Sequence, residues 1–97
     1  MNVIAWDENT AAGHSMLVTD GDHEVAIFIL RLYQGVGIGT ELTRSILGYG
    51  EKQDISKVWL TVERWNHSAI GLYEKIGFET TRAESFDLEM AIRIAAE

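Results

Sequence analysis

A glycine-rich segment between a strand-like run and a helical run constrains this chain more than any other feature of its sequence. The apolar run Val25–Leu30 leads into Tyr33–Thr40, where Gly35, Gly37 and Gly39 stand at alternate positions. A glycine turn of this kind brings several backbone N–H groups to the positive end of the following helix dipole, so it is able to hold a phosphate group. The same turn also begins helices that bind no ligand, and both interpretations stay open from this segment alone.

The rest of the chain predicts an α+β fold with the element order β-β-β-α-β-α-β-β. Short polar segments, including a predicted turn over Asp7–Gly13, separate the first three strands and predict an antiparallel meander. The third strand reaches the fourth through a helix, so these two strands should be parallel in a mixed, mostly antiparallel sheet. The expected strands are Asn2–Trp6, Ser15–Thr19, Glu24–Leu30, Lys57–Glu63, Phe78–Arg82 and Phe86–Ile94. The expected helices are Gly37–Lys52 and a second one that Asn66 or Ser68 caps and that ends at Ile76.

Composition narrows the class of protein. The 97 residues predict one domain over 1–97 with a modest core. A net charge of -7 argues against a general nucleic-acid binder, and the absence of cysteine excludes a thiolate nucleophile and a disulfide framework. No apolar run approaches the roughly 20 residues that span a bilayer, so we expect a cytoplasmic protein without a membrane segment. His14, His23 and His67 lack the spacing of metal ligands, and no metal is expected.

A second motif follows the fourth expected strand. Asn66-x-x-Ala69-x-x-Leu72-Tyr73-Glu74-Lys75-x-Gly77-Phe78 resembles the segment that carries the catalytic tyrosine of the GNAT superfamily of N-acetyltransferases. The earlier pattern Gln34-x-x-Gly37-x-Gly39 resembles the Q/R-x-x-G-x-G/A pyrophosphate loop of the same superfamily. The two motifs stand in the family's order with a helix and a strand between them, so the resemblance covers roughly Glu24–Phe78.

The resemblance implies a function and a cofactor site. It implies that an acetyl group passes from acetyl-CoA to a primary amine, of a small molecule or a protein, by direct attack on the thioester. In the family the two neighbouring parallel strands splay apart, the pantetheine arm enters the gap, and main-chain groups of the strand before the loop hold the thioester. The implied cofactor residues are Ile27, Phe28, Ile29, Gln34, Gly35, Val36, Gly37, Ile38, Gly39, Thr40, Asn66 and Tyr73.

The resemblance also implies catalytic roles. Tyr73 matches the family's general acid, which protonates the leaving thiolate, and Glu24 matches the general base of some relatives. His23 is an alternative base, and Glu63 a more distant one. Relatives that acetylate protein N-termini carry a glutamate where this chain has Thr61, which cannot act as a base. A structural role stays open for each of the two main candidates. Tyr73 also fits an aromatic residue that packs between helix and sheet, and Glu24 also fits a solvated carboxylate at a strand end.

The chain departs from the family pattern at its beginning, because the strand and two helices that usually precede the meander have no counterpart. In the family those helices form much of the wall around the acceptor. We therefore expect a truncated GNAT-like fold that associates as a homodimer and so covers apolar surface. Two other functions stay open, a non-catalytic acyl-CoA-binding or regulatory module and a structural association subunit.

Overall fold

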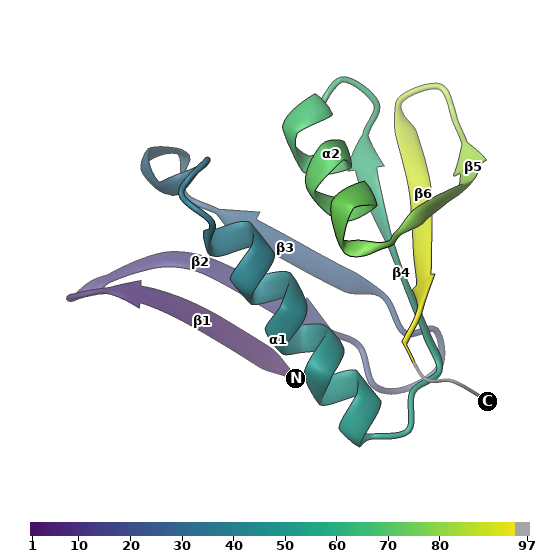
Figure 1. The fold of residues 1–97 in the computed structure, drawn as a ribbon, viewed down its shortest axis with the longest axis horizontal. Coiled ribbons are helices and arrows are strands. Elements are labelled where there is room, and N and C mark those ends of the chain that lie inside the picture. The colour runs from purple at the N-terminus through teal and green to yellow at the C-terminus, as the bar shows by residue number, and fades with distance from the viewer. Residues whose placement is uncertain (95–97) are drawn as a thin grey trace.

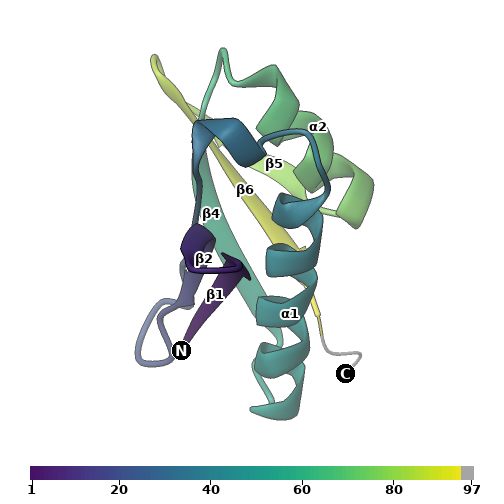
Figure 2. The same ribbon diagram turned by 90° about the vertical axis from the view of Figure 1, so that its left-hand side faces the viewer.

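The structure, a computed structural model, describes residues 1–94 and all of their side chains except that of Arg31. Two three-stranded antiparallel sheets lie edge to edge, and two helices cover the same side of them (Figure 1, Figure 2). This arrangement confirms the predicted α+β class and element order. The strands are β1 (Asn2–Asp7), β2 (Thr10–Leu17), β3 (Val25–Ile29), β4 (Lys57–Glu63), β5 (Glu79–Ala83) and β6 (Asp87–Arg93). The helices are α1 (Ile38–Lys52), α2 (His67–Ile76) and a short 3-10 turn, η1 (Arg31–Tyr33).

The first sheet is the predicted meander, with the strand order β1-β2-β3. Its strand ends differ from the predicted ones by two residues at most, except that β2 begins at Thr10 and not at Ser15. The segment Asp7–Gly13 is not a long polar turn, because β2 already begins at Thr10 and a β-bulge takes up the extra residue Ala12. A Cβ at Gly13 would lie 2.9 Å from Cδ1 of Leu42 in α1. The small residues that resemble a turn therefore allow the helix to approach the strand closely.

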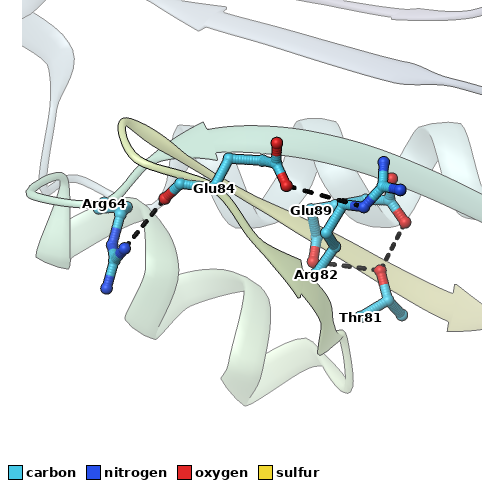
Figure 3. Close-up of polar contacts among 5 residues, drawn as sticks. All are labelled: Arg64, Thr81, Arg82, Glu84 and Glu89. Atoms are coloured by element: carbon cyan, nitrogen blue, oxygen red, sulfur yellow. Dashed lines mark hydrogen bonds and ion pairs between the residues drawn. The ribbon is translucent and has the colours of Figure 1, made fainter.

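The second sheet has the order β4-β6-β5. Figure 3 shows polar contacts around its β5–β6 hairpin. Arg64, in the turn after β4, donates from Nη1 to the Glu84 carbonyl oxygen at 2.9 Å. Thr81 donates from Oγ1 to Oε2 of Glu89 at 2.6 Å, and Nε of Arg82 lies 3.7 Å from Oε2 of Glu84. Each exposed contact contributes little energy, but the Arg64 bond ties the hairpin to the segment that leads from β4 into α2.

The two sheets meet where β3 and β4 run parallel, as the crossover predicted. The contact is one isolated bridge between Glu24 and Trp59, in which the Trp59 N–H donates to the carbonyl oxygen of His23 at 3.1 Å. Beyond this bridge no ladder joins β3 to β4 within residues 1–94, and the two strands diverge (Figure 1). The splayed pair that the resemblance implied is therefore present.

One hydrophobic core lies between the helices and the sheets. Its buried members come from both sheets, both helices and the segments that join them: Leu17, Val25, Ile46, Ile55, Val58, Leu60, Val62, Tyr73, Phe78 and Met90. The core holds α1 against the first sheet and α2 against the second, and the helices lie on either side of the line along which β3 and β4 separate (Figure 1). Neither helix in the described part of the chain is long and apolar enough to cross a membrane.

Candidate functional site

The turn before α1 leaves the start of that helix open. Gly35 and Gly37 have φ angles of 83° and 89°, in the left-handed region that favours glycine. Gly37 is the N-cap residue and no side chain caps the helix. The first helical hydrogen bond runs from the Glu41 N–H to the Gly37 carbonyl oxygen at 3.1 Å, so the N–H groups of residues 38–40 have no acceptor within the helix. Unpaired N–H groups at the positive end of a helix form a site for an anion.

The first turn of α1 lies in close contact with both β3 and α2. A Cβ at Gly39 would lie 2.9 Å from Cδ1 of Ile29 and 2.9 Å from Cδ1 of Leu72. One turn later, Thr43 donates from Oγ1 to the Gly39 carbonyl oxygen at 2.7 Å. The glycine thus allows three elements to meet at one point, and it places the open helix start beside the gap between β3 and β4.

The edge of β3 that faces this gap carries unpaired backbone groups. The hydrogen bond from the Leu30 N–H to the Ala12 carbonyl oxygen, 2.9 Å long, shows that even-numbered residues of this segment direct their backbone groups toward β2. Since these directions alternate along a strand, Ile27 and Ile29 direct their N–H and C=O groups toward the gap. No strand of the described chain pairs with them there. Both donors and acceptors are therefore available to a ligand.

These elements and one face of α2 form a cleft of about 480 Å³. Most residues predicted to bind a cofactor line it: Ile27, Ile29, Gln34, Gly35, Gly37, Gly39, Thr40, Asn66 and Tyr73. The structure places the other predicted residues outside the cleft. Phe28 directs its backbone toward β2 and is 62% exposed, because successive strand residues alternate between faces. Val36 and Ile38 line a different cavity of about 400 Å³ between β1 and α1.

Several residues that line the cleft were not predicted from the sequence. Most of them form a stripe on α2 with the spacing i, i+3, i+4 and i+7, which is one face of a helix. This spacing was the signal that could have identified them. The lining residues that were not predicted are Thr43, Ser68, Ala69, Gly71, Leu72 and Lys75.

Tyr73 lies in the wall of the cleft. The residue is only 9% exposed, and its ring centroid is 5.6 Å from that of Phe78. Burial raises the pKa of the Tyr73 phenol, a group that is already protonated at neutral pH without any shift. Its hydroxyl makes no hydrogen bond within residues 1–94. Every fully buried polar side-chain atom in those residues does have a partner, so the Tyr73 hydroxyl oxygen is not fully buried. The hydroxyl is therefore accessible from the cleft as a proton donor.

The predicted bases lie apart from this wall. Glu24 is partly buried at the bridge where β3 and β4 meet, and it does not line the cleft. The next residue, Val25, points into the core, so the Glu24 side chain lies on the side of the sheet away from the helices. Glu63 is exposed at the end of β4 and Thr61 is exposed two residues before it. His23 is partly buried beside the bridge, where its carbonyl oxygen pairs with β4.

Asn66 caps α2 from its own side chain. Its Oδ1 accepts a hydrogen bond from the Ala69 N–H at 3.3 Å, so the structural role is fulfilled. The same residue lines the cleft, which keeps a ligand contact possible for its amide group. No group of three or more His, Cys, Asp or Glu side chains in the described chain has the arrangement of a metal site.

Comparison with known proteins identifies relatives of this arrangement. The acetyltransferase (GNAT) family model matches residues 1–78. An N-alpha-acetyltransferase of Sulfurisphaera tokodaii is 35% identical over 80 residues, which are 81% of this chain and 47% of that protein. The chain thus spans about half the length of this curated relative.

Two solved structures share the fold. The ribosomal-protein-S18-alanine N-acetyltransferase of Escherichia coli superposes with a TM-score of 0.87 at 24% identity, over 100% of this chain and 70% of its own. An acetyltransferase of Salmonella typhimurium, solved with its cofactor acetyl-CoA, superposes with a TM-score of 0.88 at 15% identity, over 99% of this chain and 65% of its own.

Proposed function

The chain belongs to the GNAT acetyltransferase family, and we propose that it transfers the acetyl group of acetyl-CoA to a primary amine. One observation carries this proposal. The open start of α1, the unpaired edge of β3 and the buried phenol of Tyr73 all border a single cleft. Acetyl transfer from CoA needs a site for its phosphates, a strand edge that pairs with the amides of its pantetheine arm, and a proton donor for the thiolate that leaves.

The first two features would hold the cofactor. The N–H groups at the start of α1 suit the diphosphate, since they supply several donors and the positive end of the helix dipole. The edge of β3 at Ile27 and Ile29 suits the pantetheine arm, whose amides are able to pair with a free strand edge. A backbone N–H on this edge also suits the thioester oxygen, where negative charge develops during attack.

Tyr73 would supply the proton for the leaving group. The amine nitrogen forms a bond to the thioester carbonyl carbon, the carbon–sulfur bond breaks, and the thiolate takes the phenol proton. A phenol holds this proton at neutral pH, so Tyr73 is able to donate it. The proton lost by the amine passes to Glu24 or to water. Since Glu24 lies on the side of the sheet away from the helices, we propose that the amine enters the gap from that side.

The acceptor is proposed only as a primary amine. The relative from Sulfurisphaera tokodaii bears the name N-alpha-acetyltransferase, which favours a protein amine. Thr61 argues the other way, because it lacks the carboxylate that relatives of this kind use as a base. The net charge of -7 would attract a cationic amine of either class.

Turnover measured as thiol release tests the proposal. The chain contains no cysteine, so the CoA thiol released from acetyl-CoA is the only thiol that a disulfide reagent can detect. The acceptor panel should contain a polyamine, a lysine peptide and peptides with free N-termini. Thermal unfolding with CoA gives a second readout, since a ligand at 100 times its Kd adds about 2.7 kcal/mol of stability.

The outcomes separate the three candidate functions. Stabilisation with turnover supports the transferase. Stabilisation without turnover on any acceptor favours a non-catalytic acyl-CoA-binding module. No stabilisation by CoA contradicts both and favours a structural subunit.

We also propose that two chains associate through the side of the first sheet that faces away from the helices. Ile4, Met16 and Phe28 expose 47%, 37% and 62% of their surface there. Such a patch favours association. Sedimentation equilibrium at micromolar concentration tests it, and a strict monomer would contradict it. The cytoplasmic location stays a prediction.

A further inference from the structure

The turn that leads into α1 is held in place mainly at its two ends. Residues 34–37 are all exposed, and none of the hydrogen bonds found among the described side chains of residues 1–94 involves them. A Cβ built at Gly35 or Gly37 would meet no atom beyond the adjacent backbone within 4 Å. Glycines in such open surroundings have access to many other conformations. A ligand that binds this turn has to order it, and the cost of ordering lowers the affinity.

A hydrogen bond from the end of β1 ties the beginning of this turn to the first sheet. Tyr33, the last residue of η1, donates from its hydroxyl to Oδ2 of Asp7 at 2.7 Å. The bond raises the pKa of the Tyr33 phenol, because it stabilises the protonated form that donates. The backbone N–H of Tyr33 donates to the Leu30 carbonyl oxygen at 2.9 Å. Tyr33 is therefore held through both its backbone and its side chain.

The β1–β2 hairpin fixes the position of Asp7. Asp7 is the last residue of β1 and pairs with Thr10, so only Glu8 and Asn9 form the loop between the two strands. Glu8 has a φ angle of 54°, in the left-handed region that residues other than glycine rarely adopt. So short a loop leaves Asp7 little freedom, and its carboxylate stays within reach of η1.

The Tyr33–Asp7 bond lies just outside the proposed anion site. Neither residue lines the cleft, whereas Gln34, which directly follows Tyr33, does line it. The helix α1 fixes the other end of the turn. A second fixed point at Tyr33 would reduce the number of conformations that residues 34–37 adopt before a ligand arrives, and would so reduce the cost of ordering them.

We propose that Tyr33 and Asp7 are positioning residues, whose hydrogen bond holds residues 34–37 in the conformation that receives the diphosphate of CoA. The proposal rests on the proposed function, since it needs CoA at the start of α1. Both side chains act through the backbone of the turn and make no contact with the cofactor. Loss of the bond therefore weakens cofactor binding and leaves the proton transfer from Tyr73 unchanged.

A double-mutant cycle on CoA affinity tests this role. Tyr33→Phe removes the donor, Asp7→Ala removes the acceptor, and the double variant removes both. We expect each single variant to weaken CoA binding in calorimetric titration about fivefold, as for the loss of one hydrogen bond, and the double variant to bind no worse than either. Asp7→Asn keeps an oxygen acceptor and should restore most of the affinity. With acetyl-CoA, KM should rise by a similar factor while kcat changes little.

Glu8→Ala is the matched control for charge. Asp7→Ala removes a negative charge as well as the acceptor, and Glu8 is an exposed carboxylate in the same hairpin. Glu8→Ala should not weaken CoA binding, because loss of a negative charge cannot lower the affinity for an anion by itself. Circular dichroism verifies the fold of each variant.

Each outcome decides the proposal. A loss that is shared by the two single variants and does not grow in the double variant supports it. Equal affinities of the unaltered chain and both single variants contradict it, even where the variants unfold at lower urea, because the bond then serves the fold alone. Losses that add in the double variant, or a loss in Glu8→Ala as large as that in Asp7→Ala, also contradict it while the proposed function stands. If the unaltered chain binds no CoA, the proposed function fails, and the role of Tyr33 and Asp7 fails with it.

Discussion

The two helices that border the cleft begin in opposite ways. At α1 the N-cap is Gly37, in the left-handed conformation, and no side chain satisfies the first N–H groups. At α2 the N-cap is Asn66, and its own side chain accepts from the Ala69 N–H. Both helix starts border the same cleft, yet only the start of α2 has a side chain of the chain itself that accepts from its free N–H groups. The difference shows which helix start is available to an external anion.

The difference extends along the two walls of the cleft, which we call the α1 wall (residues 34–43) and the α2 wall (residues 66–75). The α1 wall offers backbone groups, because glycines leave no side chain between them and a ligand. The α2 wall offers side chains, namely Asn66, Tyr73 and Lys75. A backbone wall suits binding, since its donors are fixed by the helix. A side-chain wall suits chemistry, because it can position a titratable group such as Tyr73.

The largest effect is expected when the α1 wall is blocked. Gly37→Glu would place a side chain and a negative charge where we propose that the diphosphate binds, so CoA affinity should fall by a factor on the order of 100 or more, as expected when an anion site is filled by a like charge. Calorimetric titration measures the loss, and circular dichroism verifies the fold.

Gly21→Glu is the control for that variant. Gly21 also has a positive φ, 65° against 89° for Gly37, and no atom beyond the adjacent backbone lies within 4 Å of a Cβ built at either position. Both variants therefore carry a similar backbone strain and the same change of charge. If Gly37→Glu binds CoA as tightly as Gly21→Glu, the α1 start is not the anion site.

The next effect is expected on the α2 wall. Tyr73→Phe keeps the ring that packs on Phe78 but removes the proton donor. We expect kcat to fall by about 100-fold, the lower end of the range for a positioned acid, while CoA affinity changes little. Steady-state kinetics and calorimetry together measure this split.

Tyr49→Phe, which alters a partly buried tyrosine outside the cleft, should leave kcat unchanged. An unaltered kcat in Tyr73→Phe would mean that the thiolate is protonated by water.

Much of this arrangement was predictable from the sequence, because glycine and asparagine have distinct roles at helix starts. The alternating glycines of residues 35–39 identified the start of α1, and the two candidate caps Asn66 and Ser68 identified that of α2, where the structure has Asn66. Periodicity did not reveal the boundary of β2, since Ala11, Ala12 and Gly13 resemble a turn until α1 packs over them. The position of Glu24 on the far side of the sheet also depends on tertiary structure, because a strand pattern does not say which face the helices cover. Lys75 is exposed and lines the cleft, and it was not predicted because an exposed charge on a helix usually contacts only solvent.

A smaller effect distinguishes the cap of α2 from a cofactor contact. Asn66→Ala removes the acceptor for the Ala69 N–H, so the free energy of unfolding should fall by about 1 kcal/mol. Asn66→Asp keeps an acceptor and should retain that stability, but it places a negative charge beside the cleft. Urea unfolding and CoA titration of both variants measure the two roles separately. If Asn66→Asp keeps both its stability and its CoA affinity, Asn66 is a cap alone.

The smallest effect concerns the pH dependence of stability on the α2 wall. Burial raises the pKa of Tyr73 in the folded chain, so the neutral phenol is favoured there relative to the unfolded chain. Its contribution to stability is therefore complete below the unfolded pKa of about 10 and is lost as the pH rises through the higher folded pKa. Unfolding by urea at pH 8 and at pH 11 should show a loss of stability for the unaltered chain that is smaller in Tyr73→Phe. An equal loss in Tyr73→Phe and in the unaltered chain would contradict the burial of this phenol in the α2 wall, the feature that distinguishes that wall from the backbone wall of α1.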